Sequence, residues 1–131
     1  MRTSKIVCFV VHRNGKFLAE KRKADKEADP GCIVIPGGHV REGETMEDAC
    51  AREFKEEFGL ECRDFKFVCR IPYTASNKEK MDMNYFFCRV KGKPKAFEAE
   101  KLMWIARHEL EKFSFDEDRK AIAELAKAGL I

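Results

Sequence analysis

Residues 38–60 read GHVREGETMEDACAREFKEEFGL, and this segment joins a glycine-containing loop to an amphipathic helix. Thr45 is suited to cap the N-terminus of that helix and Gly59 its C-terminus, so the pattern predicts a helix over Met46–Phe58. At about 100° per residue, its apolar side chains share one side of the helix, which is expected to be buried. These side chains are Met46, Ala49, Cys50, Phe54 and Phe58.

Three glutamates depart from this pattern. Glu53 and Glu57 fall beside the apolar stripe and Glu56 lies at its margin, so the i, i+3, i+4 spacing brings three carboxylates together. Like charges on a partly buried face destabilise a helix unless a positive group joins them. Either Arg52 neutralises an ordinary surface cluster, pairing with Glu56 at i, i+4, or the cluster binds a divalent cation. Convergent carboxylates are ligands that Mg²⁺ and Mn²⁺ prefer.

The loop before the helix favours the cation. Residues 36–44 contain three glycines, which permit tight turns and the close approach of a ligand, and Pro36-Gly37-Gly38 is expected to stop the preceding strand. The loop leads into a helix N-terminus, where free N–H groups and the helix dipole favour anions. A glycine-rich loop, a helix start and a carboxylate cluster together indicate a metal–phosphate site.

Elsewhere, apolar runs alternate with turn signals. Strands are expected over Ile6–His12, Lys16–Lys21, Cys32–Ile35, Cys62–Ile71, Met83–Val90 and Leu102–Ile105. A second helix is expected over Asp116–Ala128, opened by Ser114 or Asp116 and closed by Gly129. Strands surrounding two separated helices predict a mixed α/β fold, and the length favours a single domain over residues 1–131.

Composition and charge exclude several classes of protein. The chain has 131 residues, of which 44% are hydrophobic and 37% charged, so it can bury a core and is expected to be soluble. No apolar run approaches the length of about 18 residues typical of a membrane helix. The net charge of +3 does not favour general nucleic-acid binding. Residues 38–60 carry −4 and the remainder +7, so an acidic segment sits in a mildly basic body.

The cysteines favour a reducing environment. Cys8, Cys32, Cys50, Cys62, Cys69 and Cys88 form no CxxC pair, and most lie inside apolar runs. A free thiol in such a run behaves as a small hydrophobic side chain. We therefore expect reduced core thiols in a cytoplasmic protein.

The residues of segment 38–60 match a known motif. They fill every fixed position of the pattern G-x5-E-x7-R-E-U-x-E-E-x-G-U, in which U is apolar: Gly38, Glu44, Arg52, Glu53, Phe54, Glu56, Glu57, Gly59 and Leu60. This pattern is the Nudix box, and the chain resembles the Nudix (MutT-like) hydrolase family. The Lys21-Arg22 pair and the strand that carries Trp104 also resemble the family. Ile33 departs from it, because many members have tryptophan before Pro-Gly-Gly.

The resemblance implies a Nudix fold, an α/β/α sandwich around a mixed β-sheet, and Mg²⁺- or Mn²⁺-dependent hydrolysis of a diphosphate linked to another moiety. By the same resemblance, the metal ligands are Glu53, Glu56 and Glu57, with Glu44 as a ligand or a supporting residue and Glu98 as an extra ligand. The catalytic set is Glu53, Glu56 and Glu57 with Arg52, which orients the glutamates. Glu57 or Glu56 is the preferred general base, and Glu98 or Glu100 is the distal alternative.

Four further residues are candidates for substrate binding. The backbone of Gly37 and Gly38 is expected to place the loop against the substrate. Arg22 is a candidate to contact a phosphate, although a solvated strand end explains it equally well. Tyr73, beside Pro72 in an expected loop, is a candidate to stack on a base.

These expectations converge on a hydrolase that cleaves a dNTP, an oxidised dNTP or an NTP into a nucleoside monophosphate and pyrophosphate or phosphate. ADP-ribose and dinucleoside polyphosphates are the alternative substrates. A catalytically silent module that binds a nucleotide or a protein partner is the alternative from another class, and the intact glutamates speak against it. The expected partner is a small nucleotide, with no membrane and no stable nucleic-acid complex. The oligomeric state stays open, with a homodimer among the alternatives.

Overall fold

The computed structural model describes residues 2–131, so the predicted domain start at Met1 lies outside the described residues. Seven strands run over β1 (Ser4–Arg13), β2 (Lys16–Lys21), β3 (Ile33–Val34), β4 (Gly37–His39), β5 (Lys66–Thr74), β6 (Lys80–Cys88) and β7 (Lys101–Ala106). The helices are α1 (Met46–Phe58), the 3-10 helix η1 (Arg107–Lys112) and α2 (Asp116–Lys127). Within the described part of the chain, no helix has the length and apolarity needed to cross a membrane.

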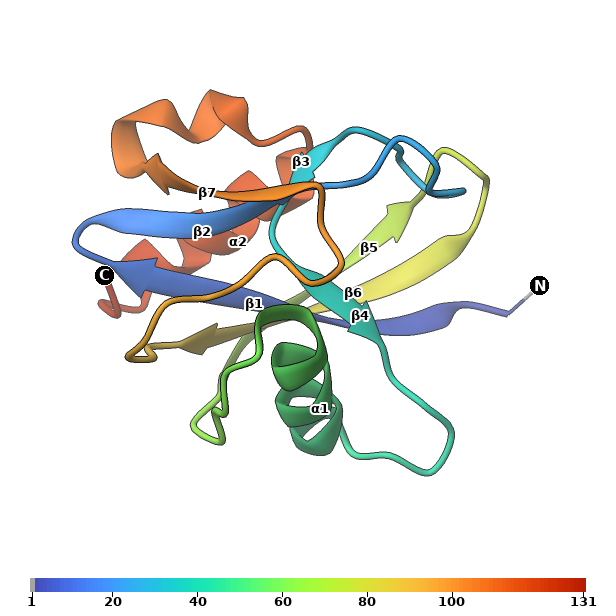
Figure 1. Cartoon of the computed structure of the whole chain (residues 1–131), viewed down its shortest axis with the longest axis horizontal. Helices are drawn as coiled ribbons and strands as arrows, with labels where there is room; N and C mark the ends of the chain where they lie inside the picture. The colour runs from blue at the N-terminus through green and yellow to red at the C-terminus, as the bar shows by residue number, and fades with distance from the viewer. Residues whose placement is uncertain (1) are drawn as a thin grey trace.

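The strands form one mixed sheet (Figure 1). Its order is β3-β2-β1-β6-β5, with β4 paired to β1 and β7 paired to β2. Only β1 and β6 are parallel among the strand pairs of residues 2–131. The N-terminal half of β1 pairs with β4, whereas β2 pairs with β1 only at His12 and Arg13. The sheet therefore opens between β2 and β4.

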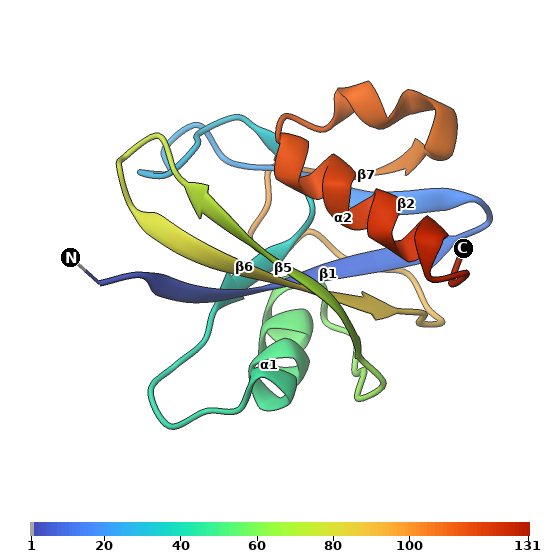
Figure 2. The ribbon, with the colours of Figure 1, turned by 180° about the vertical axis from the view of Figure 1, so that it is seen from behind.

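The central strand β1 divides the interior into two cores. Side chains alternate between the faces of a strand, and those of β1 are buried on both faces. Ile6, Cys8 and Val10 pack in the core that contains residues of α2, and their neighbours Val7, Phe9 and Val11 pack in the core that contains residues of α1. In Figure 1 α2 lies behind the sheet, and in Figure 2 it lies in front. The expected α/β/α sandwich is therefore confirmed.

Aromatic packing holds α1 against the sheet. The rings of Phe9 and Phe54 meet edge to face with centroids 5.4 Å apart, and Phe54 meets Phe58 in the same way at 4.9 Å. Both helix residues are fully buried. Because Glu53 and Glu57 each precede one of these phenylalanines, this packing sets the direction in which the two carboxylates point.

The bounds predicted for α1 are confirmed, as are its caps. The Thr45 hydroxyl accepts a hydrogen bond from the Asp48 N–H at 3.1 Å, and Gly59 ends the helix with φ +71°. The strand expected over Cys32–Ile35 lies at Ile33–Val34 and ends before Pro36-Gly37-Gly38, as predicted, and a separate strand, β4, then forms over Gly37–His39. The Phe9 N–H also donates to the Pro36 carbonyl at 2.8 Å, so the backbone continues along β1.

Three other expectations need correction. The strands expected over 62–71 and 83–90 lie at Lys66–Thr74 and Lys80–Cys88, because Cys62 and Phe65 pack against the α1 core before the strand begins. Tyr73 consequently belongs to β5 and not to a loop. Ser114 does not open α2. Its hydroxyl instead accepts a hydrogen bond from the Ile33 N–H at 2.9 Å, and Phe115 is the N-cap residue.

Gly37 is expected to be essential for the pairing of β4 with β1. A Cβ atom at this position would lie 2.2 Å from the Val7 carbonyl oxygen, which is backbone and cannot rotate away. We predict that Gly37→Ala lowers the free energy of unfolding by about 1–3 kcal/mol, measured by urea denaturation. Unfolding at the wild-type urea concentration would contradict this view of β4.

Candidate active site

A cavity of about 310 Å³ opens where β2 and β4 diverge. Residues far apart in the sequence line it, including seven of the predicted site residues: Arg22, Gly37, Gly38, Glu53, Glu57, Tyr73 and Glu98. Four predicted residues are not part of this lining: Glu44, Arg52, Glu56 and Glu100. The structure thus separates the predicted set into residues that face the cavity and residues that stand behind or beside it.

Glu57 is the most unusual group in the cavity. Its side chain lies on the buried side of α1 and the residue is 6% exposed. Its Oε2 atom is the one buried side-chain N or O atom in residues 2–131 that has no hydrogen-bond partner. Burial, followed by the charges of Glu20, Glu53 and Glu98, raises the pKa of the Glu57 carboxyl well above its usual range. A carboxylate in this environment is expected to have a cationic or proton-donating ligand.

Glu53 lies beside Glu57 and is held from behind. Its Oε1 atom accepts a hydrogen bond from Arg52 Nη1 at 2.8 Å, and its side chain is 13% exposed. Burial nevertheless raises the pKa of the Glu53 carboxyl, because it outweighs the effect of Arg52. A Cβ atom at Gly38 would lie 2.3 Å from the Glu53 carboxylate. Glycine at this position of β4 is therefore what allows the carboxylate to lie against the strand.

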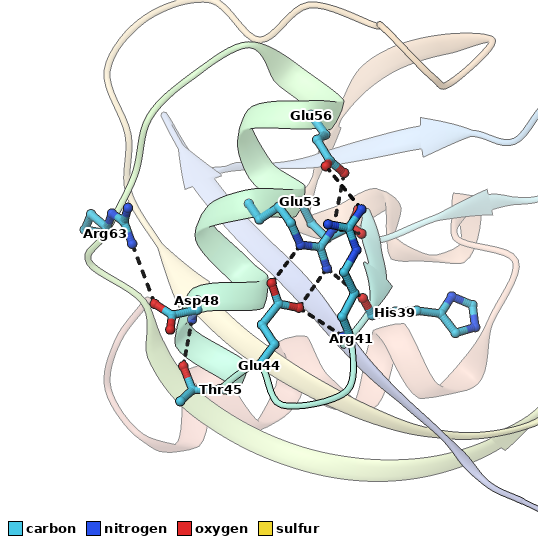
Figure 3. A network of polar contacts seen from close by, with 9 residues as sticks. His39, Arg41, Glu44, Thr45, Asp48, Glu53, Glu56 and Arg63 are labelled. Carbon is cyan, nitrogen blue, oxygen red and sulfur yellow. Dashed lines mark hydrogen bonds and ion pairs between the residues drawn. The ribbon is translucent and has the colours of Figure 1, made fainter.

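Arg52 is the centre of a polar network, and its partners His39, Glu44, Glu53 and Glu56 are labelled in Figure 3. It contacts Glu44 through two hydrogen bonds, from Nε at 2.7 Å and from Nη2 at 2.9 Å. This bidentate pairing lowers the pKa of Glu44 to about 2 and raises that of Arg52. Arg52 also donates to Glu56 at 3.2 Å and to the His39 carbonyl at 3.0 Å. One guanidinium therefore joins the loop before α1 to the glutamates on the helix.

The first interpretation, an ordinary cluster neutralised by Arg52, holds for part of the glutamates. Arg52 pairs with Glu56 as an ordinary surface cluster requires, and Arg41 approaches the same carboxylate at 3.8 Å. The Glu56 side chain is 41% exposed and does not face the cavity. Glu57, however, takes no part in the network of Arg52. Arg52 thus pairs with Glu53 and Glu56, whereas the Oε2 atom of Glu57 has no hydrogen-bond partner.

The two distal glutamates have different surroundings. Glu98 is exposed and lines the cavity, and the preceding Phe97 N–H donates to the Glu57 carbonyl at 3.3 Å, which ties this loop to the end of α1. Glu100 instead forms an ion pair with Lys21 at 3.2 Å. Of the two, Glu98 is therefore placed to act on a ligand in the cavity.

The cavity lining also includes aromatic and basic side chains. The ring centroids of Tyr73 and Phe115 are 4.6 Å apart, and both residues line the cavity. Arg22 also lines it and donates from Nε to the Ala28 carbonyl at 2.9 Å, and Lys26 lies on the same segment. The two aromatic rings suit a planar group, and the two basic side chains suit a phosphate.

Five charged or polar residues of the cavity are absent from the predicted set: Glu20, Lys26, Asp29, His39 and Glu79. Glu20 is 5% exposed in β2, and burial raises the pKa of its carboxyl to about 7. His39 Nε2 and Glu79 Oε2 are 2.8 Å apart and link β4 to the start of β6. A sequence signal exists for Glu20 alone, as a charged residue that continues the apolar run of its strand.

The donor set of the cavity fits a hard divalent cation. Six carboxylates and two basic side chains line it together with His39, so the surface is acidic. Among residues 2–131, no group of three or more His, Cys, Asp or Glu side chains is arranged so that it could by itself hold a metal ion. Mg²⁺ characteristically uses one or two carboxylates and completes its octahedral shell with waters and substrate phosphates. Glu53 and Glu57, with the unpartnered Oε2, meet that requirement.

Gly38→Ala tests the close approach of Glu53 to β4. Because the added Cβ would meet the movable end of a side chain, we predict displacement of Glu53 with less loss of stability than in Gly37→Ala. The measurement is urea denaturation of both variants, together with Mn²⁺ binding. Equal destabilisation of both variants, or unaltered Mn²⁺ binding in Gly38→Ala, would contradict the prediction.

The raised pKa of Glu57 predicts a pH dependence. A carboxyl group that binds its proton more tightly in the folded chain stabilises the fold below its unfolded pKa of about 4.3, and this contribution is lost as pH rises through the folded pKa. In EDTA, the free energy of unfolding of the wild type should therefore fall, relative to that of Glu57→Gln, as pH rises above the unfolded pKa of about 4.3. Parallel pH profiles of the two proteins would refute this assignment.

Comparisons with known proteins identify the family of the chain. The family model described as NUDIX domain matches residues 1–125. Nucleoside triphosphatase NudI of Enterobacter sp. (strain 638) is 32% identical over 129 residues, which cover 89% of this chain and 92% of that protein. The ADP-ribose pyrophosphatase of Methanocaldococcus jannaschii is 45% identical over 51 residues, which cover 39% of this chain and 29% of that protein.

The solved structure of the MutT NUDIX hydrolase from Burkholderia pseudomallei matches with a TM-score of 0.83 and 26% identity, covering 95% of this chain and 99% of that one. The family model and the NudI relative both extend well beyond residues 38–60. The chain therefore belongs to the Nudix family of pyrophosphohydrolases.

Proposed function

We propose that this enzyme uses Mg²⁺ or Mn²⁺ to hydrolyse a phosphoanhydride bond of a dNTP, an oxidised dNTP or an NTP. The products are a nucleoside monophosphate and pyrophosphate, or phosphate where the substrate is shorter. The observation that carries the proposal is Glu57, a buried carboxylate whose unpartnered Oε2 belongs to an acidic cavity. A polyphosphate can enter an acidic cavity only if cations separate the like charges.

Glu53 and Glu57 would hold the cation, with Glu98, which lines the same cavity, as a further ligand. When bound, the cation neutralises phosphate oxygens and lowers the pKa of a coordinated water. Arg52 fixes Glu53 from behind, while Glu44 and Glu56 fix Arg52. In this arrangement Glu44 and Glu56 act mainly by positioning, although both remain candidates as ligands.

Glu57 is the preferred general base of the proposal. It faces the cavity and has a free carboxylate oxygen, which can accept a proton from an attacking water. Glu56 is less suitable because it is exposed and pairs with Arg41 and Arg52. Glu98 is the distal alternative, since Glu100 is engaged with Lys21.

The substrate is expected to lie along the cavity. Arg22 and Lys26 are placed to contact phosphates, Tyr73 and Phe115 to contact the base, and the backbone of Gly37 and Gly38 to bound the site. A nucleoside triphosphate is favoured because the similarity to NudI spans nearly the whole chain. ADP-ribose is the second candidate, since the similarity to an ADP-ribose pyrophosphatase covers 51 residues only.

The proposal places the enzyme in a reducing compartment, the cytoplasm. Cys8, Cys50 and Cys88 are buried in the two cores, where thiols serve as small apolar groups. Burial raises the pKa of the Cys8 and Cys50 thiols, which keeps them protonated and unreactive.

A nucleotide panel tests the proposed substrate class. Purified protein is incubated with Mg²⁺ or Mn²⁺ and dNTPs, 8-oxo-dGTP, NTPs, ADP-ribose or a dinucleoside tetraphosphate, and monophosphate and pyrophosphate are quantified. Preferred turnover of triphosphates, abolished by EDTA, is the expected result. Preferred turnover of ADP-ribose would identify ADP-ribose, and not a nucleoside triphosphate, as the substrate. If none of these compounds is hydrolysed, the result would support a catalytically silent binding module.

Glu57→Gln should reduce kcat on the preferred triphosphate by about 100-fold or more while the protein stays folded. The loss follows from removing a cation ligand and the preferred base together. Glu47→Gln is the matched control, because Glu47 lies exposed on the same helix and outside the cavity lining. A Glu57→Gln variant as active as this control would remove the basis of the proposed mechanism.

A further inference from the structure

Glu20 is a buried carboxylate that the Nudix box does not account for. It belongs to β2, which precedes the box in the sequence, and it is 5% exposed. Backbone pairing fixes its position from both sides, since Glu20 is opposite Val34 of β3 and Leu102 of β7. A residue in the middle of three paired strands cannot move its backbone to carry the charge into solvent.

The alternation of side chains along β2 directs Glu20 toward α1. Phe17 and Ala19 belong to the α2 core, whereas Leu18 belongs to the α1 core. Glu20 is two residues from Leu18 and therefore lies on the same face of the sheet. Glu53 and Glu57 approach this face from the helix, and all three carboxylates line one cavity.

Glu20 forms no ion pair in the described part of the chain, although the positive charges of Arg22 and Lys26 act on its carboxylate. Among the ion pairs of residues 2–131, none involves Glu20, although Arg22 and Lys26 line the same cavity. Arg22 instead directs its Nε toward the Ala28 carbonyl. A buried carboxylate without a cationic partner is costly, and placing it near other carboxylates increases the cost. A proton or a shared positive ligand would offset this cost.

A second observation indicates where that ligand lies. The Oε2 atom of Glu57 is buried without a partner, and it belongs to a residue of the same cavity. We propose that Glu20 is a further carboxylate ligand of the divalent cation, supplied by strand β2 in addition to the ligands on α1. This inference rests on the proposed cation site at Glu53 and Glu57 and extends it from the helix to the sheet.

A ligand from β2 has a consequence that helix ligands alone do not have. The cation would join α1 to the sheet, so its binding should stabilise the contact between the two layers. Conversely, the metal-free protein carries a repulsion among Glu20, Glu53 and Glu57. Replacing Glu20 by a neutral side chain of the same shape should therefore reduce the repulsion in the metal-free protein. The same replacement should weaken cation binding.

Mn²⁺ binding without nucleotide provides the test. Free Mn²⁺ is followed by electron paramagnetic resonance during titration of wild type, Glu20→Gln and Glu27→Gln, and thermal unfolding of each is measured in EDTA. We expect Glu20→Gln to weaken Mn²⁺ binding by about 10-fold or more and to unfold in EDTA at or above the wild-type temperature. Glu27 is exposed and outside the cavity lining, so Glu27→Gln should match the wild type in both measurements.

Two results would overturn the inference. The first is a Glu20→Gln affinity for Mn²⁺ within about twofold of wild type, in a wild type that does bind; this leaves the proposed function intact. The second is the absence of Mn²⁺ binding in the wild type itself, which would remove the proposed cation site together with Glu20. A lower unfolding temperature in EDTA combined with wild-type affinity would identify Glu20 as a purely structural residue.

Two additional variants keep the test decisive. Glu20→Asp retains the charge but withdraws the carboxylate by one methylene from a backbone that cannot follow, so weaker Mn²⁺ binding is expected even if Glu20→Gln does not fold. In the double variant of Glu20→Gln and Glu57→Gln, two ligands of one ion should show losses in affinity that do not add. Wild-type affinity of Glu20→Asp, or additive losses in the double variant, would count against a shared ion.

Discussion

The packing of Phe54 and Phe58 against Phe9 determines how α1 is rotated about its axis. Three rings in edge-to-face contact leave the helix one orientation that keeps both side chains buried. In that orientation Glu53 and Glu57, each adjacent to a buried phenylalanine, face the opening between β2 and β4. The apolar core therefore positions charged groups, and its stability offsets the unfavourable burial of carboxylates.

Charge is distributed unevenly around these carboxylates. Arg52 satisfies the outer side of the helix through Glu44, Glu53 and Glu56, whereas the cavity side holds Glu57 and Glu20 without a basic partner. One guanidinium thus rigidifies the site without neutralising it. The result is an acidic surface, and the proposed joint entry of a cation and a polyphosphate would recover its energetic cost.

The sequence predicts the parts of this site that depend on local structure. The caps at Thr45 and Gly59 define α1, and the spacing of Glu53 and Glu57 places both on its buried side. Glu20 could not be assigned in this way, because its neighbours in space come from the register of β2 with β3 and β7. The same holds for β4, which exists because glycine lets its backbone approach Val7. Long-range pairing of this kind leaves little trace in local residue patterns.

Because β2 and β4 diverge along β1, different elements of the fold form different parts of the cavity. The floor of the cavity is made by paired backbone, and its acidic wall by a helix fixed in an aromatic core. Lys26 and Tyr73 also line the cavity, and they belong to segments outside that aromatic core; these are called the rim residues. Rim side chains can be exchanged during evolution or engineering without disturbing the catalytic wall. The architecture is therefore well suited to acquiring new substrate preferences while one hydrolytic chemistry is preserved.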